Sequence, residues 1–162
     1  MTLFPGKESK EQKVEQILLK NYNHYYRLAY SYVNNEADAG DIVQNGAYKA
    51  ILNSDSLKNE EYAATWIYRI MLNEIFRFLK KDKPFSYDEL DVELSTEDVY
   101  ENVDLRRALD TMSKEDKAVI ELKYFEDMKF SEIAEILGEN VSTVKSRLYR
   151  GLRKLKVELT DA

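Results

Sequence analysis

A run of cations near the end of the chain has the composition of a surface that binds a polyanion. Between Ser142 and Lys156 the sequence contains six cations and no acid. Side chains of this kind favour nucleic acid, because they neutralise phosphates and release counterions. The simpler interpretation is a solvated helix whose cations complement its C-terminal dipole. The six residues are Lys145, Arg147, Arg150, Arg153, Lys154 and Lys156.

A second row of side chains suited to nucleic acid lies in the first half of the chain. Its members are three or four residues apart, so a helix would bring them to one side. Cations can follow a phosphate backbone while an indole ring stacks on unpaired bases. The alternative is a core tryptophan beside an ordinary solvated face. The row, called here the Trp66 row, consists of Trp66, Arg69, Asn73, Arg77 and Lys80.

Two short helical patterns joined at a glycine would position the first group of cations. Ala134 is small where the helices would cross, Gly138 can take the positive φ that ends a helix, and Val144 would pack back across the turn. Ser142 is expected to cap the second helix, along which apolar residues recur every three or four positions as far as Leu159. This layout is typical of a DNA-binding helix-turn-helix.

Helical patterns also account for the rest of the chain outside its polar stretches. They cover residues 11–34, a segment that starts after Asn35 and runs through Ile51, and residues 62–81. Asn35 is expected to cap the second of these helices, and residues 53–61 read as a polar loop. Further on, Ser113 begins a capping-box-like pattern for a helix through Tyr124. The sequence therefore predicts an all-α protein.

The charge of the chain is concentrated in one stretch. The net charge is −6, yet residues 84–104 contain eight acids and no cation, while residues 1–83 and 105–162 each carry twelve cations and eleven acids. The stretch begins at Pro84 and shows no sustained helical period, so it is expected to be an acidic linker between two small helical domains. It is either a solubilising spacer or a segment that occupies a basic channel on a partner.

The composition argues against several classes of protein. The sequence has no cysteine and one histidine, His24, which excludes disulfides and zinc-thiolate sites and makes a metal site unexpected. It shows no cofactor-binding motif and no export signal. It also lacks a run of about eighteen apolar residues, so we expect a cytoplasmic protein without direct membrane insertion.

Three blocks of the sequence, in this order, resemble the extracytoplasmic-function (ECF) sigma factors of bacteria, members of the sigma-70 superfamily. Asp38-Ala-Gly-Asp-Ile-Val-Gln44 followed by Tyr48-Lys-Ala50 is similar to the family's polymerase-binding helix. Thr65-Trp-Ile-Tyr-Arg-Ile70 with Asn73 is similar to its promoter-melting helix. Residues 130–155, particularly Thr143-Val-Lys-Ser-Arg-Leu-Tyr-Arg150, resemble its reader of the upstream promoter element.

The resemblance implies a protein that binds bacterial core RNA polymerase, takes it to promoter DNA and helps to open the duplex, with no catalysis of its own. Domain 1–83 would bind polymerase through Asp41, Gln44 and Asn45, and the −10 element through the Trp66 row, with residues 53–61 shaping a pocket for a flipped base. The acidic linker would thread the RNA-exit path of polymerase, and an anti-sigma factor, often membrane-linked, would control the protein. Domain 105–162 would bind the −35 element through Ser142, Thr143, Lys145, Ser146, Arg147 and Arg150.

Two other functions fit parts of the sequence. A stand-alone regulator would use the helix-turn-helix to bind an operator without polymerase, which leaves the block around Asp41 and the acidic linker unexplained. A helical enzyme acting on nucleic acid would need clustered metal-binding acids or an activated nucleophile. The sequence offers no histidine pair, cysteine or phosphate-binding glycine loop for such an enzyme.

Overall fold

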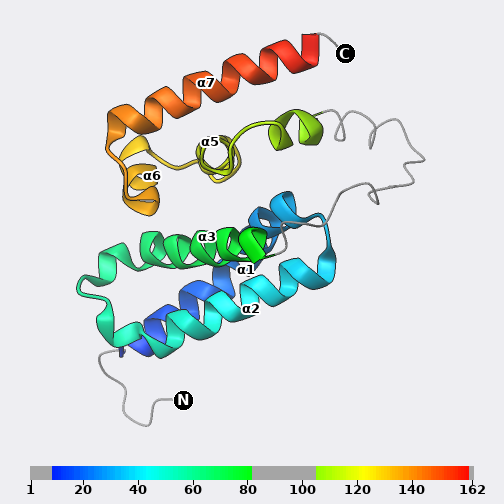
Figure 1. Ribbon diagram of the computed structural model, residues 1–162. Helices are drawn as coiled ribbons and strands as arrows, with labels where there is room; N and C mark the ends of the chain where they lie inside the picture. The colour runs from blue at the N-terminus through cyan, green and yellow to red at the C-terminus, as the bar shows by residue number, and fades with distance from the viewer. Residues whose placement is uncertain (1–8, 82–104, 161–162) are drawn as a thin grey trace. The chain divides into compact units, whose positions relative to one another are not determined.

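The computed structural model describes residues 9–81 and 105–160, with side chains as far as Val157. Within these ranges the regular elements are all helical, and the chain divides into two compact units, Met1–Arg77 and Phe78–Ala162 (Figure 1). The predicted all-α fold with two small helical domains is confirmed. The predicted acidic linker, residues 84–104, lies outside the described residues.

The first unit contains two long helices, α1 (Lys10–Val33) and α2 (Glu36–Leu52), and α3 (Ala63–Lys81) as far as Arg77. A capping box at Ser9 starts α1, and Asn34 ends it in the left-handed conformation with φ 53°. The Asn35 side chain then accepts a hydrogen bond from the backbone N–H of Asp38 at 2.8 Å, so this cap of α2 is confirmed. These local signals place the helix ends within about two residues of their predicted positions.

Aromatic and close-packed contacts hold the three helices together. The rings of Tyr25 on α1 and Tyr68 on α3 meet edge to face with centroids 5.0 Å apart. On α2, Gly46 is buried so close to α3 that a Cβ atom there would lie 2.5 Å from Sδ of Met71. This close approach explains a glycine inside a helix, where it otherwise costs about 1 kcal/mol relative to alanine.

The polar stretch between α2 and α3 contains two short 3₁₀ turns, η1 (Ser54–Ser56) and η2 (Glu60–Tyr62). Leu57, between them, is buried and anchors the stretch to the core. The predicted loop over residues 53–61 therefore contains less irregular backbone than its composition suggests, because two 3₁₀ turns take up part of it.

The second unit contains a short helix over residues 105–110, then α5 (Lys114–Ile120), η4 (Glu121–Phe125), α6 (Phe130–Leu137) and α7 (Val141–Thr160). Ser113 caps α5 by accepting a hydrogen bond from the backbone N–H of Asp116 at 3.1 Å. The predicted helix through Tyr124 is helical as far as Phe125, but its type changes along its length. The α-helix ends at Ile120, and the next five residues form a π-helical turn.

The hinge between α6 and α7 has the predicted helix-turn-helix form. Gly138 takes φ 68°, Ala134 is 8% exposed, and Val144 is fully buried. The predicted cap at Ser142 was wrong. Instead, Asn140 accepts a hydrogen bond from the backbone N–H of Thr143 at 2.8 Å, so α7 begins one residue before Ser142.

A glycine also sets how closely α7 lies against α5. Gly151 is buried, and a Cβ atom there would lie 2.7 Å from Cδ1 of Ile120. Leu148, one turn earlier, is 3% exposed on the same side. The opposite side of α7 is thereby turned to solvent. The side chain of Leu159, which was predicted to continue the buried stripe, lies outside the described residues.

Candidate nucleic-acid interface

The exposed face of α7 brings together several of the predicted DNA-binding residues. Ser142, Lys145 and Ser146 are exposed and lie at helical spacing, whereas Thr143 is only partly exposed on the flank of this face. Lys145 also extends over the ring of Phe130 on α6, with Nζ 5.5 Å from the ring centroid. The first two turns of α7 therefore present hydroxyl groups and a cation to solvent.

Tyr149 lies in the middle of this face and is 53% exposed. Tyr149 was not among the predicted DNA-binding residues, because helical periodicity alone does not show whether an aromatic ring is covered. Its spacing of three residues from Ser146 and four from Lys145 was the available signal. Arg153 continues the same face one turn later and is also exposed.

Arg147 and Arg150 project from the flank of α7 and share a buried carboxylate on α5. Asp116 is 4% exposed. Its Oδ1 accepts hydrogen bonds from Nη1 of Arg147 at 2.9 Å and from Nη2 of Arg150 at 3.0 Å, and its Oδ2 accepts one from Nε of Arg150 at 2.8 Å. The two hydrogen bonds from Arg150, together with the one from Arg147, hold the pKa of Asp116 below its ordinary value despite burial.

Arg147 is tied to a second carboxylate at the turn. Its Nε and Nη2 donate to the two carboxylate oxygens of Glu139 at 2.8 and 2.7 Å. This two-point bond is the largest cause of the raised pKa of Arg147, and only 20% of its side chain is exposed. Arg147 was predicted to contact DNA, and this stays a prediction; in the chain alone its Nε, Nη1 and Nη2 all donate to carboxylates. Arg150 has a 55% exposed side chain.

The Trp66 row lies along one side of α3, as its spacing predicted. Arg69, Asn73, Arg77 and Lys80 are exposed, and Trp66 is partly exposed rather than buried in the core. The row thus offers an aromatic ring, an amide and three cations on one helix face, which is the composition that suits a single strand.

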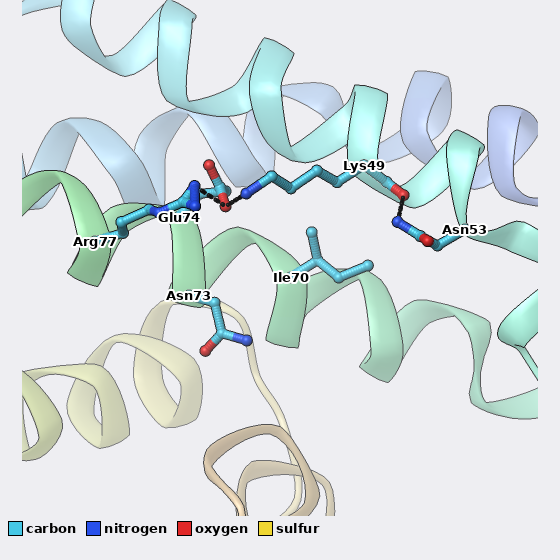
Figure 2. A pocket seen from close by; sticks show the side chains of 6 residues that line it. All are labelled: Lys49, Asn53, Ile70, Asn73, Glu74 and Arg77. Carbon is cyan, nitrogen blue, oxygen red and sulfur yellow. Dashed lines mark hydrogen bonds and ion pairs between the residues drawn. The ribbon is translucent and has the colours of Figure 1, made fainter.

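A cavity of about 330 Å³ opens beside this row (Figure 2). Glu74, which is 8% exposed, forms an ion pair with Lys49 of α2 and lies 3.8 Å from Nη1 of Arg77. Asn53 donates to the backbone carbonyl of Lys49 at 2.8 Å and is the member of the 53–61 stretch that lines this cavity. The lining residues are Lys49, Asn53, Ile70, Asn73, Glu74 and Arg77.

Lys49 and Glu74 line this cavity but were not among the residues predicted for the site. Glu74 lies one position before the apolar stripe residue Ile75, where its side chain enters the interface between α2 and α3. An acid at such an inward position needs a cationic partner, which was the signal available in the sequence.

The predicted polymerase-binding residues form one face of α2. Asp41, Gln44 and Asn45 are exposed and lie within one turn of each other. Tyr48 and Leu52, which were not selected from the sequence, continue the same face and are 67% and 65% exposed. Their apolar surface adjoins the three polar side chains on one helix face, and a contiguous exposed apolar patch favours binding by another molecule.

Two features are absent from the described residues. Among residues 9–81 and 105–160, no group of three histidine, cysteine, aspartate or glutamate side chains is placed to hold a metal ion. In the same ranges, no helix combines the length and apolar character that crossing a bilayer requires.

Comparison with known families assigns each unit to a recognised module. Residues 17–84 match sigma-70 region 2, and residues 102–155 match sigma-70 region 4. The residues between the two matches, 85–101, fall within the acidic stretch.

Two relatives are similar to this chain over most of their own length. The RNA polymerase sigma factor SigV of Bacillus subtilis (strain 168) is 43% identical over 140 residues, which covers 84% of each chain. The ECF RNA polymerase sigma factor SigW of the same organism is 31% identical over 157 residues, covering 84% of this chain and 83% of SigW.

Two solved structures share the fold. CnrH, in complex with the cytosolic domain of CnrY, has a TM-score of 0.73 at 23% identity and covers 91% of this chain and 88% of its own. RpoE in complex with the anti-sigma factor NepR, from Bartonella quintana, has a TM-score of 0.73 at 22% identity. The match covers 90% of this chain and 96% of the RpoE chain.

Proposed function

The chain belongs to the ECF sigma factors of the sigma-70 family, and from this premise we propose which of its surfaces bind RNA polymerase and which bind promoter DNA. It is an alternative sigma factor, a transcription initiation factor that binds core RNA polymerase and directs it to particular promoters. We propose that it has no enzymatic activity of its own and acts in the cytoplasm, where polymerase is.

The exposed face of α7 is our candidate for binding the −35 element. The main support is that α7, the second helix of the helix-turn-helix, exposes hydroxyl groups, cations and Tyr149 while its apolar side is buried. A helix of this composition fits the major groove, where hydroxyl groups and cations reach base edges and phosphates, and an aromatic ring can contact a thymine methyl group. The proposed contacts are Ser142, Thr143, Lys145, Ser146, Tyr149 and Arg150.

We assign the Trp66 row to the −10 element. Its cations would follow the backbone of the opened strand, and Trp66 would stack on an unpaired base. The cavity beside the row has room for a small planar ligand, and the amides of Asn53 and Asn73 have the donors and acceptors to read a base edge. We therefore propose that this cavity takes a base that leaves the stack when the promoter opens.

We propose that the exposed face of α2 binds the clamp helices of RNA polymerase. Asp41, Gln44 and Asn45 supply polar contacts, and Tyr48 and Leu52 supply apolar area that is left exposed in the chain alone. Interfaces commonly combine such an apolar centre with polar surroundings.

We also propose control by an anti-sigma factor, because RpoE, which has the same fold, was solved with one. The acidic linker, residues 84–104, would occupy the RNA-exit path of polymerase, where eight carboxylates imitate the charge of a transcript.

Reconstitution with bacterial core RNA polymerase tests the proposal. The purified chain should co-elute with core enzyme and support run-off transcription from a selected subset of a promoter library. Asp41→Ala with Gln44→Ala should reduce co-elution while the helical content stays unchanged. Full binding by that double variant would overturn the assignment of α2.

A further inference from the structure

Asp116 lies outside the exposed face of α7, yet it contacts both arginines on the flank of that helix. It comes from α5, and it precedes Arg147 by 31 residues and Arg150 by 34. Its carboxylate accepts three hydrogen bonds from these two guanidinium groups, and all three are between 2.8 and 3.0 Å long. Charge-assisted bonds of this length fix the orientation of both partners.

The two arginines are held differently. Three donor atoms of Arg147 are engaged, two by Glu139 and one by Asp116, and its side chain is mostly covered. Arg150 gives Nε and Nη2 to Asp116 and remains 55% exposed. Because an arginine carries five N–H donors in a planar fork, Arg150 keeps donors for a partner in solvent while one edge of its fork is fixed.

We propose that Asp116 is a positioning residue for recognition of the −35 element, which holds Arg150 in the orientation that contacts a base, while Arg147 ties α7 to Glu139 at the turn. This inference rests on the proposed assignment of α7 to that element. A guanidinium that is already oriented loses less side-chain freedom on binding than a freely rotating one. The bonds to Asp116 therefore favour a two-point contact between Arg150 and guanine.

The arrangement divides tasks that the sequence assigned to both arginines alike. Arg150 is the base-contacting side chain, and Arg147 acts through the position of the helix. Asp116 serves both arginines from a buried position where α5 meets α7. Removing one partner of a buried ion pair is strongly destabilising, so this carboxylate and its two cations depend on one another.

The test uses the full-length chain in holoenzyme with core RNA polymerase and a promoter obtained from the run-off selection. Each base pair of the −35 element is substituted in turn, and initiation is compared with the parent promoter. Asp116→Asn keeps the shape of the side chain but removes its charge. Glu115→Gln is the matched control, because it removes an acid from the same turn, and within the described residues no hydrogen bond or ion pair joins Glu115 to either arginine.

We expect Arg150→Ala to lose discrimination at one or two base pairs, by about tenfold at each. Asp116→Asn should lose discrimination at the same base pairs, and the double variant should resemble Arg150→Ala alone, because both changes remove one contact. Glu115→Gln should behave like the parent. Polymerase binding should be unchanged in all of them.

The outcomes separate the two proposals. If Arg150→Ala relaxes discrimination and Asp116→Asn leaves it intact, or weakens all promoters alike, the positioning role of Asp116 is wrong. If Arg150→Ala itself changes no base preference, the assignment of Arg150 to the −35 element fails, and the role of Asp116 fails with it.

A second variant keeps the proposal testable if Asp116→Asn does not fold. Asp116→Glu keeps the charge and moves the carboxylate by one methylene group, so the domain should fold while Arg150 is displaced. Partial relaxation at the same base pairs is then expected, and discrimination like that of the parent would overturn the proposal.

Discussion

Gly46 and Gly40 occupy the same helix, but they face different surroundings. A Cβ atom at Gly46 would lie 2.5 Å from Sδ of Met71, whereas one at Gly40 would have no heavy atom of a neighbouring element within 4 Å. Alanine improves helix propensity by about 1 kcal/mol at either position, so the pair isolates the contact with Met71. We expect Gly46→Ala to be less stable than Gly40→Ala by about 1–3 kcal/mol in urea unfolding. Equal stabilities would show that Met71 moves aside without cost.

Glu121 is a buried carboxyl group in the π-helical turn. Burial raises its pKa from the ordinary 4.5 to about 7, Lys117 opposes this shift, and Glu126 and Asp110 add to it. Between these two pKa values the folded chain holds the proton and the unfolded chain has released it. Stability from this group is therefore present at low pH and is lost as the pH rises from about 4.5 through 7.

Replacing Glu121 by glutamine should remove this dependence. We expect Glu121→Gln to be more stable than the parent at about pH 8, by about 1–3 kcal/mol, and nearly equal to it at about pH 5. Urea unfolding at the two pH values measures the difference, with the exposed Glu135→Gln as the control. A constant difference between the variant and the parent would contradict the raised pKa.

The face of α2 provides a test at the level of a helix. Tyr48 and Leu52 are exposed, so Tyr48→Ala with Leu52→Ala should leave the helix folded while the Kd for core polymerase rises about tenfold or more. Titration of labelled chain with polymerase measures this. Leu19→Ala on α1, where Leu19 is 81% exposed, is the control for losing apolar surface away from α2. Equal effects of the two changes would deny α2 a particular role.

The helices that the sequence predicted well are those with local end signals. Asn35 and Ser113 cap helices by contacting a backbone N–H three residues later, and Gly138 ends one with its own φ angle. The cap of α7 was misplaced because Asn140 and Ser142 both suit a cap, and only the path of the turn decides between them. The family motifs identified the chain because three blocks occur in order.

Contacts between distant residues could not be predicted. The pairing of Asp116 with two arginines spans more than thirty residues, and the fit of Gly46 on Met71 depends on how α2 crosses α3. The exposed apolar side chains Tyr48 and Tyr149 were missed because periodicity alone does not distinguish a covered aromatic ring from a bare one.

The molecule as a whole should bind promoter DNA poorly without polymerase. Residues 1–83 and 105–162 each have an excess of one cation, which gives little electrostatic affinity, and the acids of residues 84–104 repel DNA. Polymerase would hold both DNA-binding surfaces at once and make the second contact intramolecular.

We therefore expect the free chain to bind a promoter fragment with a Kd of about 1 μM or weaker at physiological salt. Addition of core polymerase should produce selective binding in the same fluorescence anisotropy assay. Tight sequence-specific binding by the chain alone would contradict this division of affinity.

Trp66 is the single tryptophan of the sequence, and it lies partly exposed on α3, on the face that we assign to the opened strand. Excitation at wavelengths where the twelve tyrosines do not absorb therefore reports on this one surface. Stacking of a base on the indole would quench its emission, so the unmodified protein carries an optical probe for the moment at which the two DNA strands separate.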